Sequence, residues 1–388
     1  MKKTLLLVVA LLLAAGSTGA WVWYCLTKPY QGFAQGGVFV AVPRGASARG
    51  VGHLLERNGV VRSALVFEIY ARRHPKRAAQ AGEYLFDRPL TSRDVFWKLA
   101  KGEVYQVPFT VREGETIYDI ARDLEAGHFM LADDFLKAAT DPMLVRDIAP
   151  HAMTLEGFLF PATYQLPRHP AATDLTAMMV KKFKEEWNRI SQPVPRSDQP
   201  QPASSYPVSS ILTLASLVER ETPKPEERPL VAGVFENRLR KDMRLQCDPT
   251  VIYALEQEGR YTGSLTTTDL QVHSPYNTYE HTGLPPGPIG NPGEASLRAA
   301  LQPAKTDYLY FVANTQGGHF FSATLAEHNR NVTKYRRLLA GLPADPPPPP
   351  PKPKARPKPR PRAQQRAVSK KRPVSRKALS KQHKGTTG

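Results

Sequence analysis

Two acidic residues, Glu219 and Glu221, stand two positions apart in the segment LASLVERETPKP. The residues before them are apolar at helical spacing, and the run ends before Pro223, because the residue that precedes a proline avoids the α-helical region. The pattern predicts a helix that starts near Ser209 or Ser210, either of which could cap it, and ends near Glu221. At about 100° per residue, the two acidic side chains lie about 200° apart, so at most one of them faces a given site.

A carboxyl group in the last turn of a helix is suited to acid–base chemistry. The negative end of the helix dipole and partial burial both disfavour the carboxylate, so both raise its pKa. A carboxyl that stays protonated near neutral pH can act as a general acid. Glu219 shares its helix face with the small residues Ala215 and Ser216, which leaves room for a ligand. The alternative is a structural carboxylate paired with a neighbouring base such as Arg220 or Arg228.

Further polar residues lie in other segments, and their side chains suit hydroxyl and N-acetyl groups. Glu156, in LEGFLFP, is a candidate second acid, and the alternative is a buried, hydrogen-bonded turn residue. Asp248, in QCDPTV, is expected to cap a helix that starts near Pro249. The uncharged or weakly basic candidates for substrate binding are Gln246, Tyr276, Asn277, Thr278, Tyr279, His319 and Asn329.

Neither a metal nor a cofactor is expected. The chain has two cysteines, Cys25 and Cys247, and no His/Cys cluster with zinc-like spacing. Because Cys25 falls in an apolar N-terminal segment, the remainder of the chain has no partner for an intramolecular disulfide. The glycine-rich stretch at 283–293 lacks the spacing of a phosphate-binding loop and is interpreted as a rigid wall of a cleft.

The elements that must position these residues are of mixed type, which predicts an α+β fold. Residues 42–60 and 111–129 look alike: each has a short strand, a glycine, a capping Ser47 or Thr116, and a helix. Gly59 and Gly127 are expected to end these two helices in the left-handed conformation. Helical runs are predicted around 175–190, 230–240, 296–301 and 323–339, a strand at 308–313, and a surface loop at 191–207.

The N-terminus has the composition of a membrane anchor. Residues 4–26 carry no charge and follow Lys2 and Lys3. A bilayer core of about 30 Å takes about 20 apolar helical residues. The two lysines favour a cytoplasmic N-terminus, and the aromatic residues at 21–24 suit the opposite interface. We therefore expect a single-pass inner-membrane protein whose remaining chain lies outside the cytoplasm, away from nucleic acid. The alternative is a signal peptide cleaved after residues 18–20.

The net charge of +18 is concentrated at the other end of the chain. Residues 343–388 hold 14 Lys or Arg and one acid, Asp345, so they carry +13 and the preceding 342 residues carry +5. This segment opens with prolines 346–351 and has almost no apolar residues, so we predict a disordered tail. It is either a solvated spacer or an electrostatic tether for anionic lipid or cell-wall polymer.

Two resemblances give these patterns a context. FTVREGETIYDIARDLEAG resembles the LysM module, which implies a site for N-acetylglucosamine polymers or a scaffold that has lost sugar affinity. The segments LEGFLFPATY, LASLVERET, VFENRLRKDMRLQCDPTVIYAL, SPYNTYEHTGLPPGPIGNPG and YLYFVANTQGGHFFSATLAEHN, in this order, resemble the MltG/YceG family of membrane-anchored endolytic murein transglycosylases. This second resemblance covers roughly residues 39–339.

The family resemblance implies a reaction and a division into domains. It implies cleavage of the β-1,4 bond between N-acetylmuramic acid and N-acetylglucosamine without water, giving a 1,6-anhydro end, with Glu219 as the catalytic acid. Glycan strands are then the substrate, and cell-wall synthases are candidate partners. The expected domains are a stub and transmembrane anchor (1–30), a membrane-proximal α/β unit (31–105), a LysM-like subdomain (106–140), a YceG-type catalytic domain (141–342) and the tail (343–388).

Two other functions stay open at this point. One is a non-catalytic peptidoglycan-binding scaffold of the wall-synthesis or division machinery, for which replacement of Glu219 by Gln would change nothing. The other is a binder that depends on the basic tail, for which deletion of 343–388 would abolish function.

Overall fold

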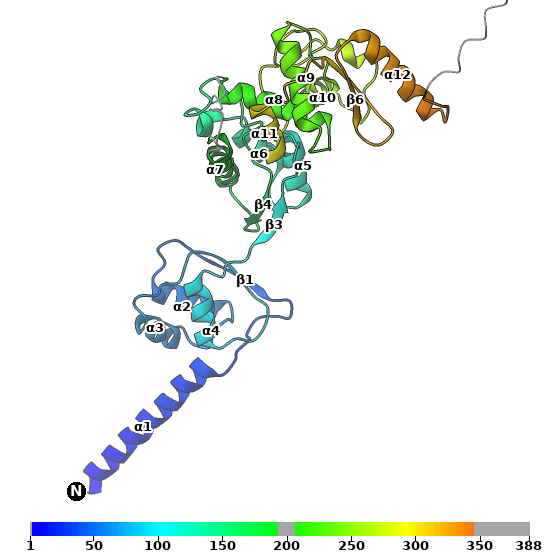
Figure 1. Cartoon of the computed structure of the whole chain (residues 1–388). Coiled ribbons are helices and arrows are strands. Elements are labelled where there is room, and N and C mark those ends of the chain that lie inside the picture. Colours follow the sequence, from blue (N-terminus) through cyan, green and yellow to red (C-terminus); the bar gives the residue numbers. More distant parts are fainter. Residues whose placement is uncertain (1, 193–205, 345–388) are drawn as a thin grey trace, which may run out of the picture. The chain divides into compact units, whose positions relative to one another are not determined.

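The computed structural model describes residues 2–192 and 206–344, and within these ranges the chain is α+β, as predicted (Figure 1). The strands are β1 (Val38–Val42), β2 (Gly82–Phe86), β3 (Val107–Thr110), β4 (Thr163–Leu166), β5 (Tyr310–Ala313) and β6 (His319–Ser322). The helices are α1 (Lys2–Thr27), α2 (Ala48–Arg57), α3 (Ala64–Arg72), α4 (Ser92–Lys101), α5 (Ile117–Ala126), α6 (Ala132–Ala139), α7 (Ala172–Ser191), α8 (Val208–Glu221), α9 (Arg228–Arg240), α10 (Asp248–Gln257), α11 (Glu294–Leu301) and α12 (Leu325–Leu339), with short 3₁₀ turns η1 (Pro142–Val145) and η2 (Asp269–Gln271). Residues 193–205 of the predicted loop and 345–388 of the predicted tail lie outside the described ranges.

Helix α1 is long and apolar enough to cross a membrane. Its mean hydropathy reaches 2.2 over an 18-residue window, and none of that window is buried. An uncleaved anchor and a signal sequence share these properties. The C-terminal end of the helix is held by the folded chain, because the Ser92 hydroxyl donates to the Cys25 carbonyl over 2.9 Å and Cys25 is buried.

The first core cluster comprises buried residues between Val40 and Ala100. Strands β1 and β2 pair antiparallel, with Val40 opposite Tyr84, and helices α2, α3 and α4 pack with them. Ser47 caps α2 as predicted, since its hydroxyl accepts from the Gly50 N–H. Gly59 has the left-handed φ of 68° that was expected after this helix.

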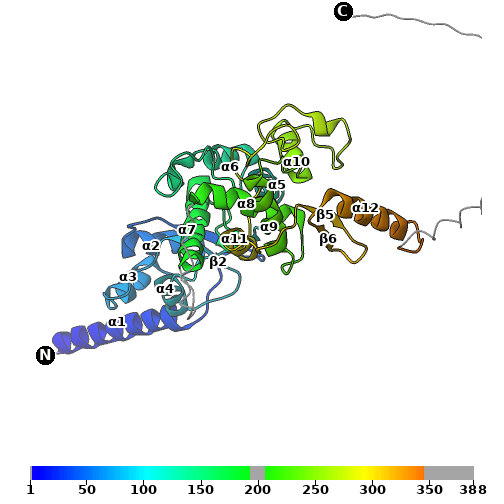
Figure 2. The ribbon, with the colours of Figure 1, turned by 45° about the horizontal axis from the view of Figure 1, so that its top comes forward.

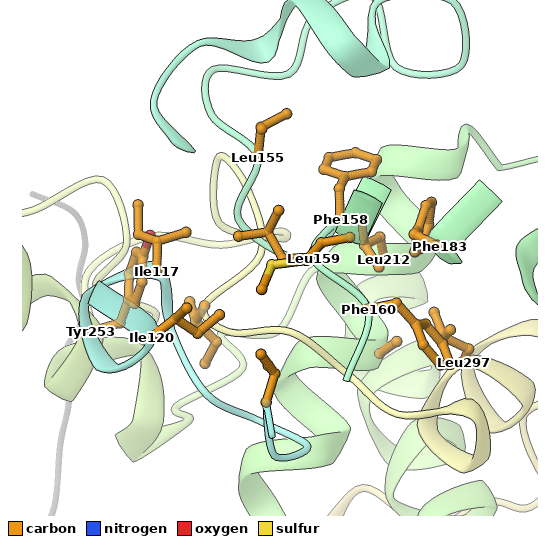
Figure 3. Packing of buried hydrophobic residues seen from close by; sticks show 14 of the residues in the cluster. Ile117, Ile120, Leu155, Phe158, Leu159, Phe160, Phe183, Leu212, Tyr253 and Leu297 are labelled. Atoms are coloured by element: carbon orange, nitrogen blue, oxygen red, sulfur yellow. The ribbon is translucent and has the colours of Figure 1, made fainter. Parts of the chain in front are cut away.

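The second core cluster runs from Phe109 to Ala300 and contains most of the other elements. Strand β3 pairs antiparallel with β4, so the strand before α5 is joined to a segment more than fifty residues later. Figure 3 shows Phe158 and Leu159, from the loop before β4, near Phe183 of α7 and Leu212 of α8, with Leu155 farther along the same loop. Residues on both sides of the predicted boundary at 140/141 share this cluster, and the domain limits remain predictions.

The ends of α5 and α8 differ from the sequence-based expectations. Thr116 caps α5 in a full capping box with Asp119, as predicted, but Gly127 has a φ of −79° and His128 is the left-handed residue, with a φ of 58°. The turn closes one residue later because the Phe129 N–H bonds to the Leu124 carbonyl, which brings the Phe129 ring against Phe109.

Helix α8 begins without the serine cap that was predicted. It starts at Val208, and no side chain caps it. Pro207 precedes the helix with a φ of −54°, and the ring of a proline fixes this angle, so the turn forms without a hydroxyl acceptor. The predicted C-terminal end at Glu221 is confirmed, and the next residue, Thr222, is extended.

The C-terminal described elements are a hairpin and a helix. Strands β5 and β6 pair antiparallel, and α12 packs on both of them (Figure 2). Helix α9 also contacts β5, and the guanidinium of Arg238 donates to the carbonyl of Leu309, the residue before β5, over 2.6 Å. The hairpin is therefore held close to the chain that follows α9.

Candidate active site

The two glutamates at the end of α8 have different neighbours, as their spacing predicted. Glu219 contacts Arg228 at the start of α9 and Gly293 before α11. Glu221 lies against Cys247 and Asp248 at the start of α10. One helix end therefore supplies a carboxyl group to each of two separate environments.

Glu219 is held in a buried ion pair. Its Oε1 accepts from Arg228 over 2.6 Å and its Oε2 accepts from the Gly293 N–H over 2.9 Å. Only 5% of the Glu219 side chain and 6% of the Arg228 side chain are exposed. Burial raises the pKa of Glu219, while the Gly293 N–H and the Arg228 charge oppose that rise. Both oxygens are thus engaged by the protein.

A pocket of about 620 Å³ lies beside Glu219. It is lined by Arg112, Glu113, Gly114, Glu115, Asp119, Arg122, Glu219, Arg220, Thr222, Pro223 and Arg228. Its charges are largely paired: Arg112 bonds to Glu115 and Asp123, Arg122 to Asp119, and Arg228 to Glu219. The contacts that join the LysM-like segment to the end of α8 are the Arg228–Glu113 pair, at 3.4 Å, and the bond from Arg220 to the Gly114 carbonyl, at 3.2 Å.

The Glu221 carboxyl has a pKa near neutrality. The residue is half-buried, its carboxyl does not line the pocket beside Glu219, and burial raises its pKa from the ordinary 4.5 to about 7. Hydrogen bonding with the Cys247 thiol and the charge of Arg238 lower the pKa, while the Asp248 carboxylate raises it. A carboxyl with a pKa near 7 can both give and accept a proton at neutral pH.

Three predicted binding residues are gathered next to Glu221. The exposed Gln246 has a left-handed φ of 51°, and its N–H bonds to the Thr278 carbonyl over 3.1 Å. The Thr278 hydroxyl accepts from the Cys247 N–H over 2.9 Å, and the Tyr279 hydroxyl donates to the Asp248 carboxylate. The residues at 246–248, where α10 begins, and the loop at 274–279 are therefore held together beside this acid.

The predicted cap by Asp248 is wrong, because α10 already begins at this residue and Cys247 is the capping position without a side-chain bond. The Asp248 carboxylate bonds to Tyr279 instead. Tyr276 and Asn277 belong to the same loop but are buried, and the Asn277 amide donates to the Leu270 and Val272 carbonyls. These two residues hold the shape of the loop.

Glu156 is a buried hydrogen-bonded residue, which was one of its two predicted roles. It is 2% exposed and accepts from the Ile117 N–H (3.1 Å), the Tyr253 hydroxyl (3.1 Å) and the Asn291 amide (3.0 Å). Burial raises its pKa to about 8. It does not line the pocket beside Glu219.

His319 and Asn329 lie on the C-terminal elements. The imidazole Nδ1 of His319 is 2.7 Å from Glu227, whose carboxylate also accepts the His319 N–H over 3.0 Å. Glu227 in turn accepts from the hydroxyl of Thr222, the residue after α8, over 3.4 Å. His319 is therefore tied to the end of the α8 helix, whereas Asn329 is exposed on α12, a helix with no buried residues.

Several residues of this site were missed from the sequence or given another role. Arg238 is buried and faces Glu221, and it also bonds to the Leu245 carbonyl over 2.6 Å, next to the turn at 246–248. Its position four residues after the apolar Val234 on α9 is a signal, because a base on an apolar helix face requires a partner. Cys247 was interpreted as a small buried filler, and it is buried but also touches the acid. Within 2–192 and 206–344, no three His, Cys, Asp or Glu side chains come together as metal ligands.

Comparison with known proteins gives matches over most of the chain. The profile described as the YceG-like family matches residues 40–334. A Bacillus subtilis protein named endolytic murein transglycosylase is 34% identical over 329 residues, which are 80% of this chain and 88% of that protein. A Streptococcus pneumoniae protein of the same name is 30% identical over 363 residues, 85% of this chain but 64% of its own length. A crystal structure of a YceG-like protein from Listeria monocytogenes is 34% identical, covers 76% of this chain and 98% of that one, and superposes with a TM-score of 0.48.

Proposed function

Because the chain belongs to the YceG-like family, we propose that it is an endolytic lytic transglycosylase that acts on peptidoglycan. The B. subtilis and S. pneumoniae relatives carry the name of that activity, and the chain covers most of the first of them. The bond cleaved is the β-1,4 link between N-acetylmuramic acid and N-acetylglucosamine. Cutting within nascent strands terminates their elongation.

The proposed reaction needs one carboxyl group and no water. The acid protonates the glycosidic oxygen as its bond to muramic C1 breaks. The muramic C6 hydroxyl then bonds to the same C1, and its proton passes to the carboxylate, which restores the acid. The product is a 1,6-anhydro end. Because the nucleophile belongs to the sugar that is attacked, proximity supplies part of the rate enhancement. This differs from glycosidases that use two carboxyl groups.

The observation that carries the proposal is the pair of carboxyls at the end of α8, of which Glu219 lines the pocket and Glu221 has a pKa of about 7. Glu219, which the family resemblance indicates, stays a prediction. Its ion pair with Arg228 and its bond from Gly293 occupy both oxygens inside the protein. This ion pair and the pKa of Glu221 are the grounds for proposing Glu221 as the acid and Glu219 as the residue that joins α8, α9 and the chain before α11. The pocket beside Glu219 is the ground for testing both residues.

The surface beside Glu221 supplies groups for binding the sugars. The exposed Gln246 directly precedes Cys247, which bonds to the acid, and the Tyr279 hydroxyl donates to the neighbouring Asp248. An amide can bond to N-acetyl and hydroxyl groups, and an aromatic face packs on a sugar ring. Thr278, Asn277 and Tyr276 hold this loop, and His319 with Glu227 holds the hairpin against the end of α8. Sugar binding by the LysM-like segment remains a prediction.

A pair of single substitutions tests which carboxyl acts. Purified glycan strands are digested with the full chain, with Glu221→Gln and with Glu219→Gln, and 1,6-anhydro ends are quantified by mass spectrometry. Glu221→Gln is expected to lose about 100-fold to 10,000-fold in rate while remaining folded. Glu226→Gln, an exposed neighbour, is the control and keeps full activity.

The Glu219→Gln variant is expected to lose stability but to keep its transglycosylase activity. It leaves the buried Arg228 charge without its closest partner, which costs about 3–5 kcal/mol. Thermal unfolding is therefore measured beside activity, and turnover is compared below the unfolding range. A folded, inactive Glu219→Gln beside an active Glu221→Gln would instead assign the acid to Glu219. Full activity of both variants would favour the non-catalytic scaffold.

A membrane location completes the proposal. Helix α1 has the length and apolarity of a single span. With Lys2 and Lys3 before it, the N-terminus is cytoplasmic and the catalytic part lies outside the inner membrane. Nascent strands are made at that surface, so cell-wall synthases are the proposed partners. Alkaline phosphatase fused after residue 344 tests this topology. The fusion is expected to be active and to stay in the membrane fraction.

A further inference from the structure

One face of helix α3 exposes apolar side chains beside basic ones. Leu65 is 60% exposed and Ile69 is 40% exposed, while Val66 and Phe67 of the same helix are buried. Leu65, Ile69 and Arg72 are spaced four and three residues apart, so they form a single stripe along the helix. A stripe that combines large apolar side chains with a base is typical of a helix that lies at a membrane surface.

Basic residues continue immediately after this helix. Arg72, Arg73, Lys76 and Arg77 are all exposed, in the segment ARRHPKR. Arg72 pairs with Glu68 over 2.6 Å. The segment therefore offers several cationic groups to solvent at the end of the apolar stripe.

The surrounding part of the chain is basic, unlike the remainder of the body. Residues 28–104 contain 13 Lys or Arg and 6 Asp or Glu, a net charge of +7. Residues 105–342 contain 24 Lys or Arg and 28 Asp or Glu, a net charge of −4. Positive charge is thus concentrated in the segment that directly follows α1, where it favours an anionic surface.

The C-terminal end of α1 is packed against this same segment. Helix α1 contacts both α3 and α4, and Ser92 bonds to the Cys25 carbonyl. The Arg62 guanidinium, just before α3, lies 4.7 Å from the centre of the Tyr24 ring. Trp21, Trp23 and Tyr24 are exposed at this end of the helix and suit the interface of a bilayer. A bilayer crossed by α1 would therefore end close to α3.

We propose that the α3 face, defined as Leu65, Ile69, Arg72, Arg73, Lys76 and Arg77, lies on the membrane surface and binds anionic phospholipid. The two apolar side chains enter the boundary between headgroups and acyl chains, and the four basic side chains bind headgroup phosphates. Each basic residue near an anionic surface strengthens docking roughly fivefold. The proposal rests on α1 being a retained anchor, and it does not depend on which glutamate is the catalytic acid.

The test uses the full chain in nanodiscs made of phosphatidylcholine, with or without phosphatidylglycerol. Ile69→Cys is labelled with bimane, and quenching by nitroxide-bearing lipid is measured. Leu131→Cys is the matched control, since Leu131 is 64% exposed on the loop before α6, and labelled native chain corrects for the buried Cys25 and Cys247. We expect strong quenching at position 69 in the anionic nanodiscs, weaker quenching in neutral ones, and little at position 131.

Neutralisation separates headgroup binding from apolar contact. In a background with Arg72, Arg73, Lys76 and Arg77 changed to Gln, quenching at position 69 is expected to fall to the level seen in phosphatidylcholine, and added salt should act in the same direction. Equal quenching at positions 69 and 131 would overturn the proposal. If quenching at position 69 changes neither with lipid charge nor with the four substitutions, the assignment of anionic headgroups as the ligand is overturned. The measurement contains no glycan, so its outcome is independent of transglycosylase activity.

Discussion

At the residue scale, the surroundings of the Glu221 carboxyl shift its pKa in opposite directions. Burial favours its protonated form, and the Cys247 thiol and the Arg238 charge favour its ionised form. Because Cys247 is itself buried, the pKa of its thiol is raised well above the ordinary value, so the S–H proton stays in place as a hydrogen-bond donor. The thiol is thus a positioning group for the proposed acid.

This balance predicts a pH profile and its change in a variant. Turnover should fall as pH rises through about 7, because the acid must start protonated. Cys247→Ala removes a bond to the ionised form, so the pKa of Glu221 rises and the decline moves to higher pH, whereas Cys247→Ser keeps a donor and stays close to the native profile. The profiles are measured as initial rates of anhydro-end formation. Identical midpoints in all three proteins would show that the thiol does not act on the acid.

Glu156 predicts a pH dependence of stability. Its pKa is about 8 in the folded chain against 4.5 for an ordinary glutamate, so between these values the folded state binds one proton more than the unfolded state. The free energy of unfolding therefore decreases as pH rises from about 4.5 to about 8. In Glu156→Gln this contribution is absent, and stability should decline less steeply over that range.

Urea unfolding at a series of pH values checks this prediction, with Glu226→Gln as the exposed control. A slope in Glu156→Gln that equals the native slope would mean that Glu156 is ionised in the folded chain. The three donors that point at its oxygens would then outweigh the effect of burial.

At the element scale, helices α2 and α3 approach each other at Gly52. A Cβ atom at this position would lie 2.8 Å from the Ala64 carbonyl oxygen, closer than packed atoms allow. Gly52→Ala should therefore push α3 away from α2 and destabilise the first core cluster by about 1–3 kcal/mol. Gly50→Ala, on the same helix, meets nothing closer than 3.4 Å and is expected to be neutral or stabilising, since alanine favours a helix. The midpoints of thermal unfolding of the two variants are compared, and equal midpoints would contradict the packing argument.

The sequence predicted the positions of the helices more accurately than it predicted the residues at which they begin and end. Apolar periodicity located α7, α8, α9 and α12, and the capping residues Ser47 and Thr116 were identified correctly. The ends that were wrong depend on contacts distant in sequence or on backbone geometry. The turn after α5 closes with the Phe129 ring against Phe109. The Asp248 carboxylate bonds to the Tyr279 hydroxyl and does not cap α10. Local propensity does not contain such contacts.

At the scale of the whole molecule, the site is assembled from segments that the sequence separates. The neighbours of Glu221 come from positions 238, 246–248 and 279, and those of Glu219 from 228 and 293. The spacing of the two glutamates predicted that they face apart, but which one is held in a buried ion pair depends on this assembly. The resemblance to a family indicated the reaction, and the contacts distinguish the two acids.

The tail offers a test at the same scale. Both buried core clusters lie between Val40 and Ala300, so a chain that ends at residue 344 should keep the native unfolding midpoint and turnover on soluble strands. Its net charge falls from +18 to +5, so its retention on anionic membranes or wall polymer should weaken and become less sensitive to salt. Loss of turnover on truncation would instead assign the activity to the basic tail.

The central claim is that a single carboxyl group catalyses bond formation between the muramic C6 oxygen and C1, as the glycosidic bond to C1 breaks, without water. Digestion of purified glycan strands in water enriched in heavy oxygen, followed by mass spectrometry of the new ends, tests it directly. The account predicts 1,6-anhydro ends that carry no heavy oxygen, and their disappearance in Glu221→Gln. Reducing ends labelled with heavy oxygen would show hydrolysis and contradict the account.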